Sequence, residues 1–157
     1  MKNTIKLPAL GLLAMLAFAG CKDKTKEIGD PSSKLQGIND VWVLEKVEQA
    51  DPSDAEFVID VTPVFTEGGA PEMTINSADL TYSFNVTDPI FIGTSGSWTF
   101  DDNAFPTRID ATYNGNTAPL KLLRTVRTVD QHLSFQLMRY CDGGTASTIY
   151  HFTFKRK

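Results

Sequence analysis

The sequence predicts an all-β protein, an antiparallel up-and-down meander of about eight to nine strands closed into a barrel. Three observations predict this fold. Apolar and polar residues alternate with a period of two in several segments, turn-forming residues separate those segments, and no ten-residue window beyond position 20 has an apolar period of 3.6. The 157 residues are enough for one domain of this kind. Closing the meander would remove the two edges that an open sheet leaves unprotected.

The clearest alternation runs from Asp79 to Val86, where every second residue is apolar. The same period is found around Phe135 and around Phe152. Shorter examples contain Val41, Val43 and Val47; Phe57, Ile59 and Val61; Trp98 and Phe100; Ile109, Ala111 and Tyr113; and Leu120 and Leu122. Each of these segments is expected to be a half-buried strand with one face on the core.

Turn signals lie between the predicted strands. Asn114-Gly115 is the strongest hairpin signal in the chain, because a type I′ turn needs two residues that accept positive φ. Asp101-Asp102-Asn103 predicts a turn rather than a calcium loop, since it lacks the Gly and the distal Glu of such a loop. The stretch 93–97 (GTSGS) has the composition of a nucleophile elbow but not its last Gly, so a loop is expected there.

The N-terminus has the three-part layout of a secretory signal. Lys2 and Lys6 precede the uncharged stretch from Leu7 to Gly20, and small residues stand just before Cys21. We therefore expect a signal-peptide helix in residues 1–20. Residues 21–39 would be a lipidated Cys followed by a flexible polar tether, because this stretch has few apolar residues to bury. The barrel domain would span residues 40–157.

The segment Phe18-Ala19-Gly20-Cys21 resembles the lipobox of bacterial lipoproteins. The resemblance implies that Cys21 is acylated and becomes the mature N-terminus, with palmitate-like chains that hold the protein on a membrane. Lys22 differs from the Asp that retains many such lipoproteins in the inner membrane. The resemblance therefore implies the outer membrane, on either its periplasmic or its surface side.

The order of the segments resembles the lipocalin-like domains of small bacterial outer-membrane lipoproteins of unknown function. A lipobox and a polar tether are followed by an early Trp segment with Gly37 and Trp42, by Ile59-Asp60-Val61-Thr62, and by strands with alternating aromatic residues. This resemblance covers residues 35–157 and implies a lipocalin-like barrel.

Charge and composition narrow the choice of partners. A net charge of −4 and a pI near 5.1 give no basic field for a nucleic-acid backbone. His132 and His151 are the only histidines, and each lies on the polar side of its strand, which favours exposed side chains over a metal pair. No catalytic constellation is found, and no cofactor or metal is expected.

Cys141 is the only cysteine left once Cys21 is lipidated, so no intramolecular disulfide is expected. In a regular strand Cys141 would lie on the same face as Leu133, Phe135 and Leu137, which predicts a buried thiol. The alternative is a reactive Cys near the turn at Asp142.

Two functions remain open, and they predict different barrel interiors. The first is a module that binds a small apolar ligand in a cavity of about 300 Å³ or more. The second is an accessory envelope lipoprotein whose barrel is filled by its own side chains and which contacts a protein partner. The aromatic residues expected to point inward, and hence the candidate ligand site, are Tyr82, Phe84, Trp98, Phe100, Tyr113, Phe135, Tyr150 and Phe152.

Overall fold

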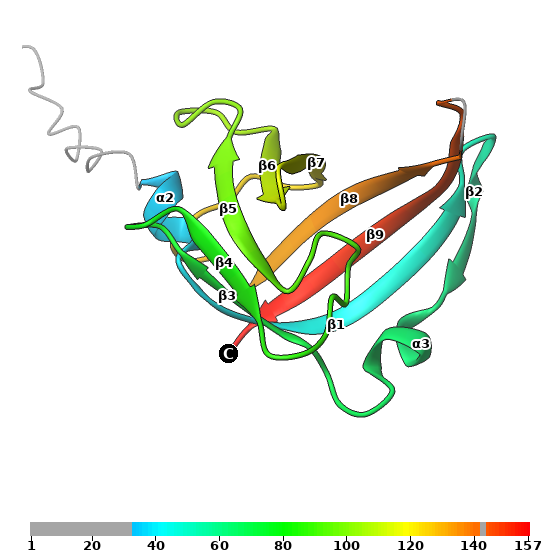
Figure 1. Cartoon of the computed structure of the whole chain (residues 1–157), viewed down its shortest axis with the longest axis horizontal. Helices are drawn as coiled ribbons and strands as arrows, with labels where there is room; N and C mark the ends of the chain where they lie inside the picture. Colours follow the sequence, from blue (N-terminus) through cyan, green and yellow to red (C-terminus); the bar gives the residue numbers. More distant parts are fainter. Residues whose placement is uncertain (1–32, 142–143) are drawn as a thin grey trace, which may run out of the picture. The chain divides into compact units, whose positions relative to one another are not determined.

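The computed structural model describes residues 33–141 and 144–157. It confirms the predicted fold class: eight antiparallel strands form a closed β-barrel, and one extra strand pairs with the first (Figure 1). The predicted signal-peptide helix and Cys21 lie outside the described residues.

The barrel strands follow one another as a meander that closes where the last strand pairs with the first. They are β1 (Asp40–Asp51), β3 (Glu72–Asn76), β4 (Thr81–Phe84), β5 (Ser95–Phe100), β6 (Arg108–Tyr113), β7 (Asn116–Leu122), β8 (His132–Tyr140) and β9 (Ala146–Arg156). The extra strand is β2 (Asp54–Asp60), and two short helices are α2 (Lys34–Ile38) and α3 (Thr62–Thr66).

Three strands are longer than the rest, and this gives the barrel two different ends. β1, β8 and β9 have 12, 9 and 11 residues and pair over most of their length. β3 pairs with the first part of β1, and β2 pairs with the last part. The long strands therefore continue past the closed part as a sheet that ends in β2 (Figure 1). We call this the open end, and the opposite end, next to α2, the closed end.

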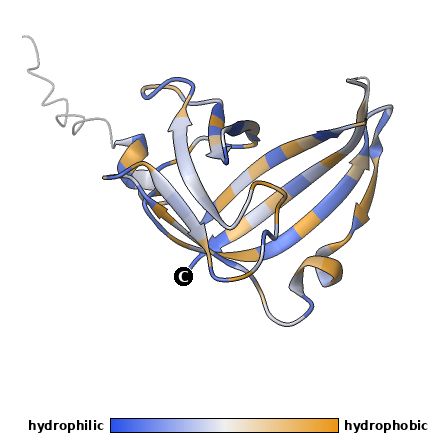
Figure 2. Cartoon of the chain, viewed as in Figure 1, coloured by the Kyte–Doolittle hydropathy of each residue, from blue (hydrophilic) through white to orange (hydrophobic). Residues whose placement is uncertain are grey.

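The inward face of β1 differs from the predicted one. Trp42 and Leu44 are buried, whereas Val41 and Val43 are half-buried. The pairing of β1 with β9 shifts register between Leu44 and Lys46, so that Val47 returns to the core face. A bulge of this kind inserts one residue and changes the parity beyond it, which a strict period of two does not anticipate. Figure 2 shows the alternation of apolar and polar residues along β1, β8 and β9.

The turn predictions have mixed outcomes. The Asn114-Gly115 hairpin is confirmed: both residues have positive φ, 48° and 80°, and Tyr113 pairs with Asn116. The predicted loop over 93–97 is partly wrong, because β5 already begins at Ser95. Position 96 of that strand requires Gly, because a Cβ there would come within 2.2 Å of the Thr112 carbonyl oxygen of β6.

The closed end is sealed by a helix that the sequence prediction placed in the tether. Residues 34–38 form α2, which begins after Ser33, whose Oγ accepts the Gln36 N–H. Ile38 is fully buried in the core. The tether prediction is therefore wrong over these residues, because Leu35 and Ile38 pack on the core and Trp42 donates a hydrogen bond to the Ile38 carbonyl.

Candidate functional site

The barrel interior is filled by its own side chains. A cavity among the core side chains of the barrel has a volume of about 20 Å³, about the room that a single water molecule needs. Its walls are apolar: Met73, Ile75, Tyr82, Ile92, Trp98, Ile109, Ala111, Leu120 and Phe135. A drug-sized ligand needs about 300 Å³ or more, so this space is too small for one.

The eight aromatic residues predicted to form a ligand site have different positions. Five are buried in the core: Tyr82, Trp98, Phe100, Phe135 and Phe152. Phe84 and Tyr150 are half-buried and pack against the core. Tyr113 is 38% exposed and is therefore not part of the buried core. It has the parity of buried Ala111 but lies at the end of β6, where its ring lies against Gly93.

The loop between β4 and β5 covers the barrel at its open end. Ile90 and Ile92 are buried in the core, whereas Phe91 between them is 44% exposed. Phe91 has a φ of 65°, which is uncommon for a bulky residue and costs conformational energy. The carboxylate of Asp88 accepts the Ile92 N–H at 3.0 Å. The two isoleucines therefore anchor the loop and hold the Phe91 ring at the surface.

Tyr82 ties this loop to the barrel wall. Its hydroxyl donates a hydrogen bond to the Ile92 carbonyl. Burial raises the pKa of Tyr82 to about 12, and the nearby Asp88 carboxylate contributes in the same direction. The neutral phenol is thus the form that the folded protein stabilises.

This pKa predicts a loss of stability at high pH. Because the pKa in the folded state lies above the ordinary value of 10.0, the stabilisation is complete below about pH 10 and is lost as the pH rises through about 12. We expect the loss to reach about 2 kcal/mol. Urea unfolding of the wild type and of Tyr82→Phe between pH 8 and 12 measures it. A free energy difference between the two proteins that does not change with pH would contradict the assignment.

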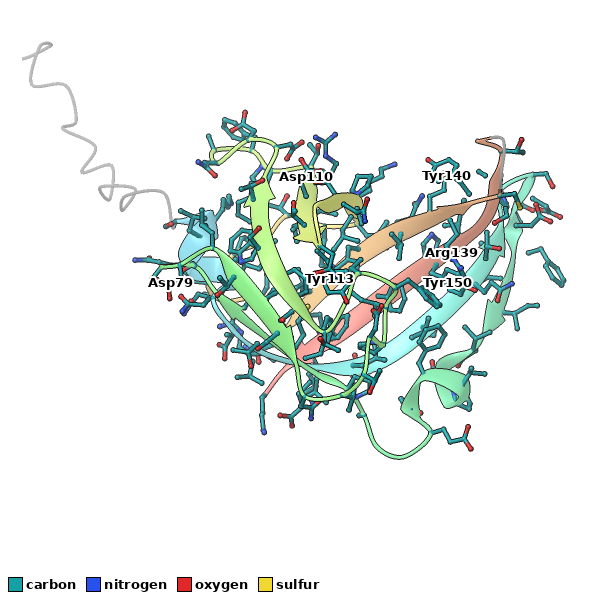
Figure 3. All side chains as sticks on the ribbon, viewed as in Figure 1. Asp79, Asp110, Tyr113, Arg139, Tyr140 and Tyr150 are labelled. Atoms are coloured by element: carbon teal, nitrogen blue, oxygen red, sulfur yellow. The ribbon has the colours of Figure 1, made fainter. Side chains whose placement is uncertain are left out.

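Three side chains contact Phe91, and together with it we call them the mouth cluster: Phe65, Phe91, Arg139 and Tyr150. The Phe65 ring of α3 lies edge-on to Phe91 at 5.9 Å and to Tyr150 at 6.0 Å between centroids. The Arg139 guanidinium lies 4.4 Å from the centroid of the Phe91 ring, a cation–π contact. Arg139 and Tyr150 come from the adjacent strands β8 and β9 (Figure 3).

A groove of about 450 Å³ lies outside the barrel beside the mouth cluster. It runs between the α3–β3 segment and the β4–β5 loop, and it is open to solvent. Its walls are Val64, Phe65, Glu67, Gly68, Gly69, Pro71, Val86, Thr87, Asp88, Pro89 and Phe91. This groove on the surface is therefore much larger than the cavity of about 20 Å³ among the core side chains.

Exposed apolar side chains gather next to this groove. On β2, Phe57, Val58 and Ile59 are 60%, 42% and 47% exposed, and Val64 of α3 is 73% exposed. Together with Phe91 we call these residues the open-end surface. Single exposed apolar residues are common, but several on adjoining elements are typical of an interaction site. The alternation signal in 57–61 found the strand but not its exposure, because an edge strand and a core strand share one period.

The part of the chain that forms β2 and α3 carries acidic but no basic residues. Residues 47–107 contain 11 Asp and Glu and no Lys, Arg or His. Of these, Asp51, Asp54, Glu56 and Glu67 form no ion pair with another residue in the described part of the chain. Carboxylates therefore predominate along β2 and next to α3, while the cation Arg139 lies against Phe91.

The remaining polar candidates do not come together. His132 lies 3.2 Å from the Glu45 carboxylate, and His151 pairs with Gln136 of β8. Among residues 33–141 and 144–157, no three His, Cys, Asp or Glu side chains are close enough to hold a metal ion. Asp101 is a turn residue, as predicted: its carboxylate accepts the Thr107 hydroxyl and backbone N–H groups, and these bonds lower its pKa to about 2.

The thiol of Cys141 is exposed, so the prediction of a buried cysteine is wrong. β8 ends at Tyr140, and its pairing with β9 shifts register between Arg139 and Tyr140. Across such a bulge, inward and outward side chains no longer alternate in the same phase, so the residues before it do not predict which way Cys141 faces.

This exposure predicts fast thiol labelling. In a Cys21→Ala background, Cys141 should react with a maleimide in the native protein about as fast as in urea, since no burial slows access. Mass spectrometry after short labelling times measures the rate, and the further change Cys141→Ser is the blank. Labelling only after denaturation would restore the buried assignment.

The strand pairing defines the chain as a closed eight-stranded antiparallel barrel with an added edge strand. Comparison of the sequence with models of known protein families gave no match, and comparison with curated proteins gave none either. In the described part of the chain, no helix has the length and apolar character to cross a membrane.

Proposed function

We propose that the protein is a lipoprotein of the outer membrane, anchored through Cys21, whose lipocalin-like barrel is an accessory module that contacts an envelope protein. The packed interior carries this proposal, because about 20 Å³ inside the barrel leaves no room for a ligand. Of the two functions that the sequence left open, a filled barrel favours the accessory one.

The open-end surface is where we place this contact. It combines exposed apolar residues with the aromatic side chain of Phe91, and aromatic anchors are enriched where protein interfaces gain most of their binding energy. The positive φ of Phe91 also supports this role. Backbone strain of this kind is often found at functional positions.

A small apolar ligand in the surface groove is the second candidate. The groove of about 450 Å³ is large enough for one, and Phe65 and Phe91 supply aromatic walls. Such a ligand would lie outside the barrel, far from the predicted contact with Trp98 in the core. Binding measurements therefore separate the two functions.

Titration with a fluorescent fatty-acid analogue tests the ligand function. We expect no saturable binding to the whole protein, because the interior is filled. Wild type is compared with Trp98→Ala, which enlarges the interior, and with Phe91→Ser, which alters the groove. Saturable binding by wild type that Phe91→Ser weakens would favour a ligand in the groove over a protein partner.

The anchor gives a separate prediction. Mass spectrometry of the mature protein should show loss of residues 1–20 and acyl chains on Cys21, and Cys21→Ala should release the protein from membranes or leave it unprocessed. Cys141→Ser is the matched control and should remain anchored. Recovery of an unmodified chain that begins at Met1 would contradict the lipoprotein assignment.

A further inference from the structure

β2 is an edge strand with an unprotected side. Its only strand partner in the described residues is β1, on one side. Soluble proteins commonly protect such edges with charged side chains, especially Lys, with Pro or with a covering loop. The charges of β2 are all acidic, so they repel another acidic strand but not a basic one. β2 contains neither Lys nor Pro, and its middle residues Phe57, Val58 and Ile59 are exposed. An extended segment of another chain could therefore add to this edge.

The pairing identifies which groups of β2 face the free side. Val61 donates its N–H to the Val47 carbonyl of β1, and the register continues as Ile59 opposite Gln49. In an antiparallel pair, hydrogen-bonded and non-bonded residue pairs alternate. Val58 and Asp60 consequently direct their N–H and C=O groups to the free edge.

The two faces of the strand differ in chemistry. Ile59 lies opposite Gln49, which pairs on its other side with Tyr150, so this face continues into the aromatic mouth cluster. Asp60 lies opposite Glu48 on the other face. β2 as a whole carries Asp54, Glu56 and Asp60 and no basic residue.

This charge disfavours a second copy of the chain as the occupant. Two β2 strands that paired antiparallel would bring their acidic residues together, and like charges across strands are destabilising. A partner strand with basic residues would gain attraction from the same carboxylates.

We propose that the free edge of β2 binds an extended segment of a partner protein in which apolar and basic residues alternate. The segment forms backbone hydrogen bonds with Val58 and Asp60 and extends the sheet by one strand. Its apolar residues lie on the face of Ile59, and its basic residues lie on the face of Asp60. This inference rests on the proposed function and names the chemistry of the partner.

Peptide binding to the lipidated protein in phosphatidylcholine nanodiscs tests it. The probe is a fluorescent eight-residue peptide of alternating Ile and Lys, and fluorescence anisotropy measures binding, with empty nanodiscs as the blank. We expect saturable binding. The same peptide with N-methyl groups on alternate amides, and an Ile/Glu peptide, should bind at least about tenfold more weakly, since they lose backbone bonds or charge attraction.

Two variants place the peptide on β2. Val58→Pro removes one N–H from the free edge without touching a bond to β1, and should weaken binding about tenfold. The double variant Asp54→Asn, Glu56→Gln should also weaken binding and reduce its dependence on salt, because it removes two carboxylates. This test does not depend on whether the proline variant folds. Thermal unfolding checks both folds.

Unchanged binding by these variants, equal binding of the N-methylated or Ile/Glu peptide, or no binding of the Ile/Lys peptide would each overturn the inference. None of these outcomes removes the proposed function, because a partner could contact Phe91 and Val64 without adding a strand. Failure of the proposed function is instead seen when photo-cross-linkers at the open end capture no protein in the cell envelope.

Discussion

Replacing Phe135 with Ala is expected to lower the free energy of unfolding by about 3–5 kcal/mol. The Phe135 side chain is fully buried, and its ring lies 5.6 Å from Phe154 and 5.7 Å from Phe152 between centroids. It already borders the small cavity of the barrel. Loss of the ring would enlarge that cavity, because the surrounding strands of a closed barrel cannot move inward without breaking the hydrogen bonds between them.

Urea unfolding of the whole chain measures this effect. Phe105→Ala is the matched control, since the Phe105 side chain is 81% exposed and should change stability by less than about 0.5 kcal/mol. A loss below about 1 kcal/mol for Phe135→Ala would mean that the interior is not packed as described.

Replacing Arg156 with Met is expected to cost about 2–4 kcal/mol, the second largest effect. The guanidinium donates to the Asp40 carboxylate at 2.7 Å, to the Gly37 carbonyl at 2.9 Å and to the Asp130 carbonyl at 3.0 Å. It also lies 4.7 Å from the centroid of the Trp42 ring. One side chain of β9 thus joins α2, β1 and the loop before β8 at the closed end.

Lys serves as the conservative replacement at this position. Arg156→Lys keeps the charge but cannot form the planar fork of bonds, so it should recover only part of the stability. Arg108→Met is the control for loss of an exposed ion pair, because Arg108 contacts Asp110 at the surface. Thermal unfolding compares the three. Equal stability of wild type and Arg156→Met would show that the closed end is held by apolar contacts alone.

The strands and the main hairpin were predictable from the sequence because their signals are local. Alternation around Phe135 and Phe152 and the Asn114-Gly115 pair each report on backbone geometry within a few residues. Barrel closure was predictable only in general terms, from the need to protect edges. The pairing of β1 with β9 depends on contacts across more than 100 residues, and no local pattern encodes it.

The errors came from features that change parity or exposure without changing the local pattern. Because of the bulge in β1, Val47 is buried as expected but Val41 and Val43 are not, and the register shift at the end of β8 leaves Cys141 exposed. The strand 54–60 was found, but its edge position was not, since β1 had to be known to accept both β2 and β3 on one side. The mouth cluster brings together residues from α3, the β4–β5 loop, β8 and β9, and only the assembled fold shows it.

Site-specific photo-cross-linking in living cells tests the central claim, that a filled barrel contacts a protein through its open end. Benzoylphenylalanine is placed in the lipidated chain at Val64 or Phe91 of the open end, or at Val129, which is 73% exposed in the loop before β8 at the closed end. We predict an adduct with one envelope protein from Val64 and Phe91 and none from Val129. Adducts of equal yield from all three positions, or none from any, would contradict the claim.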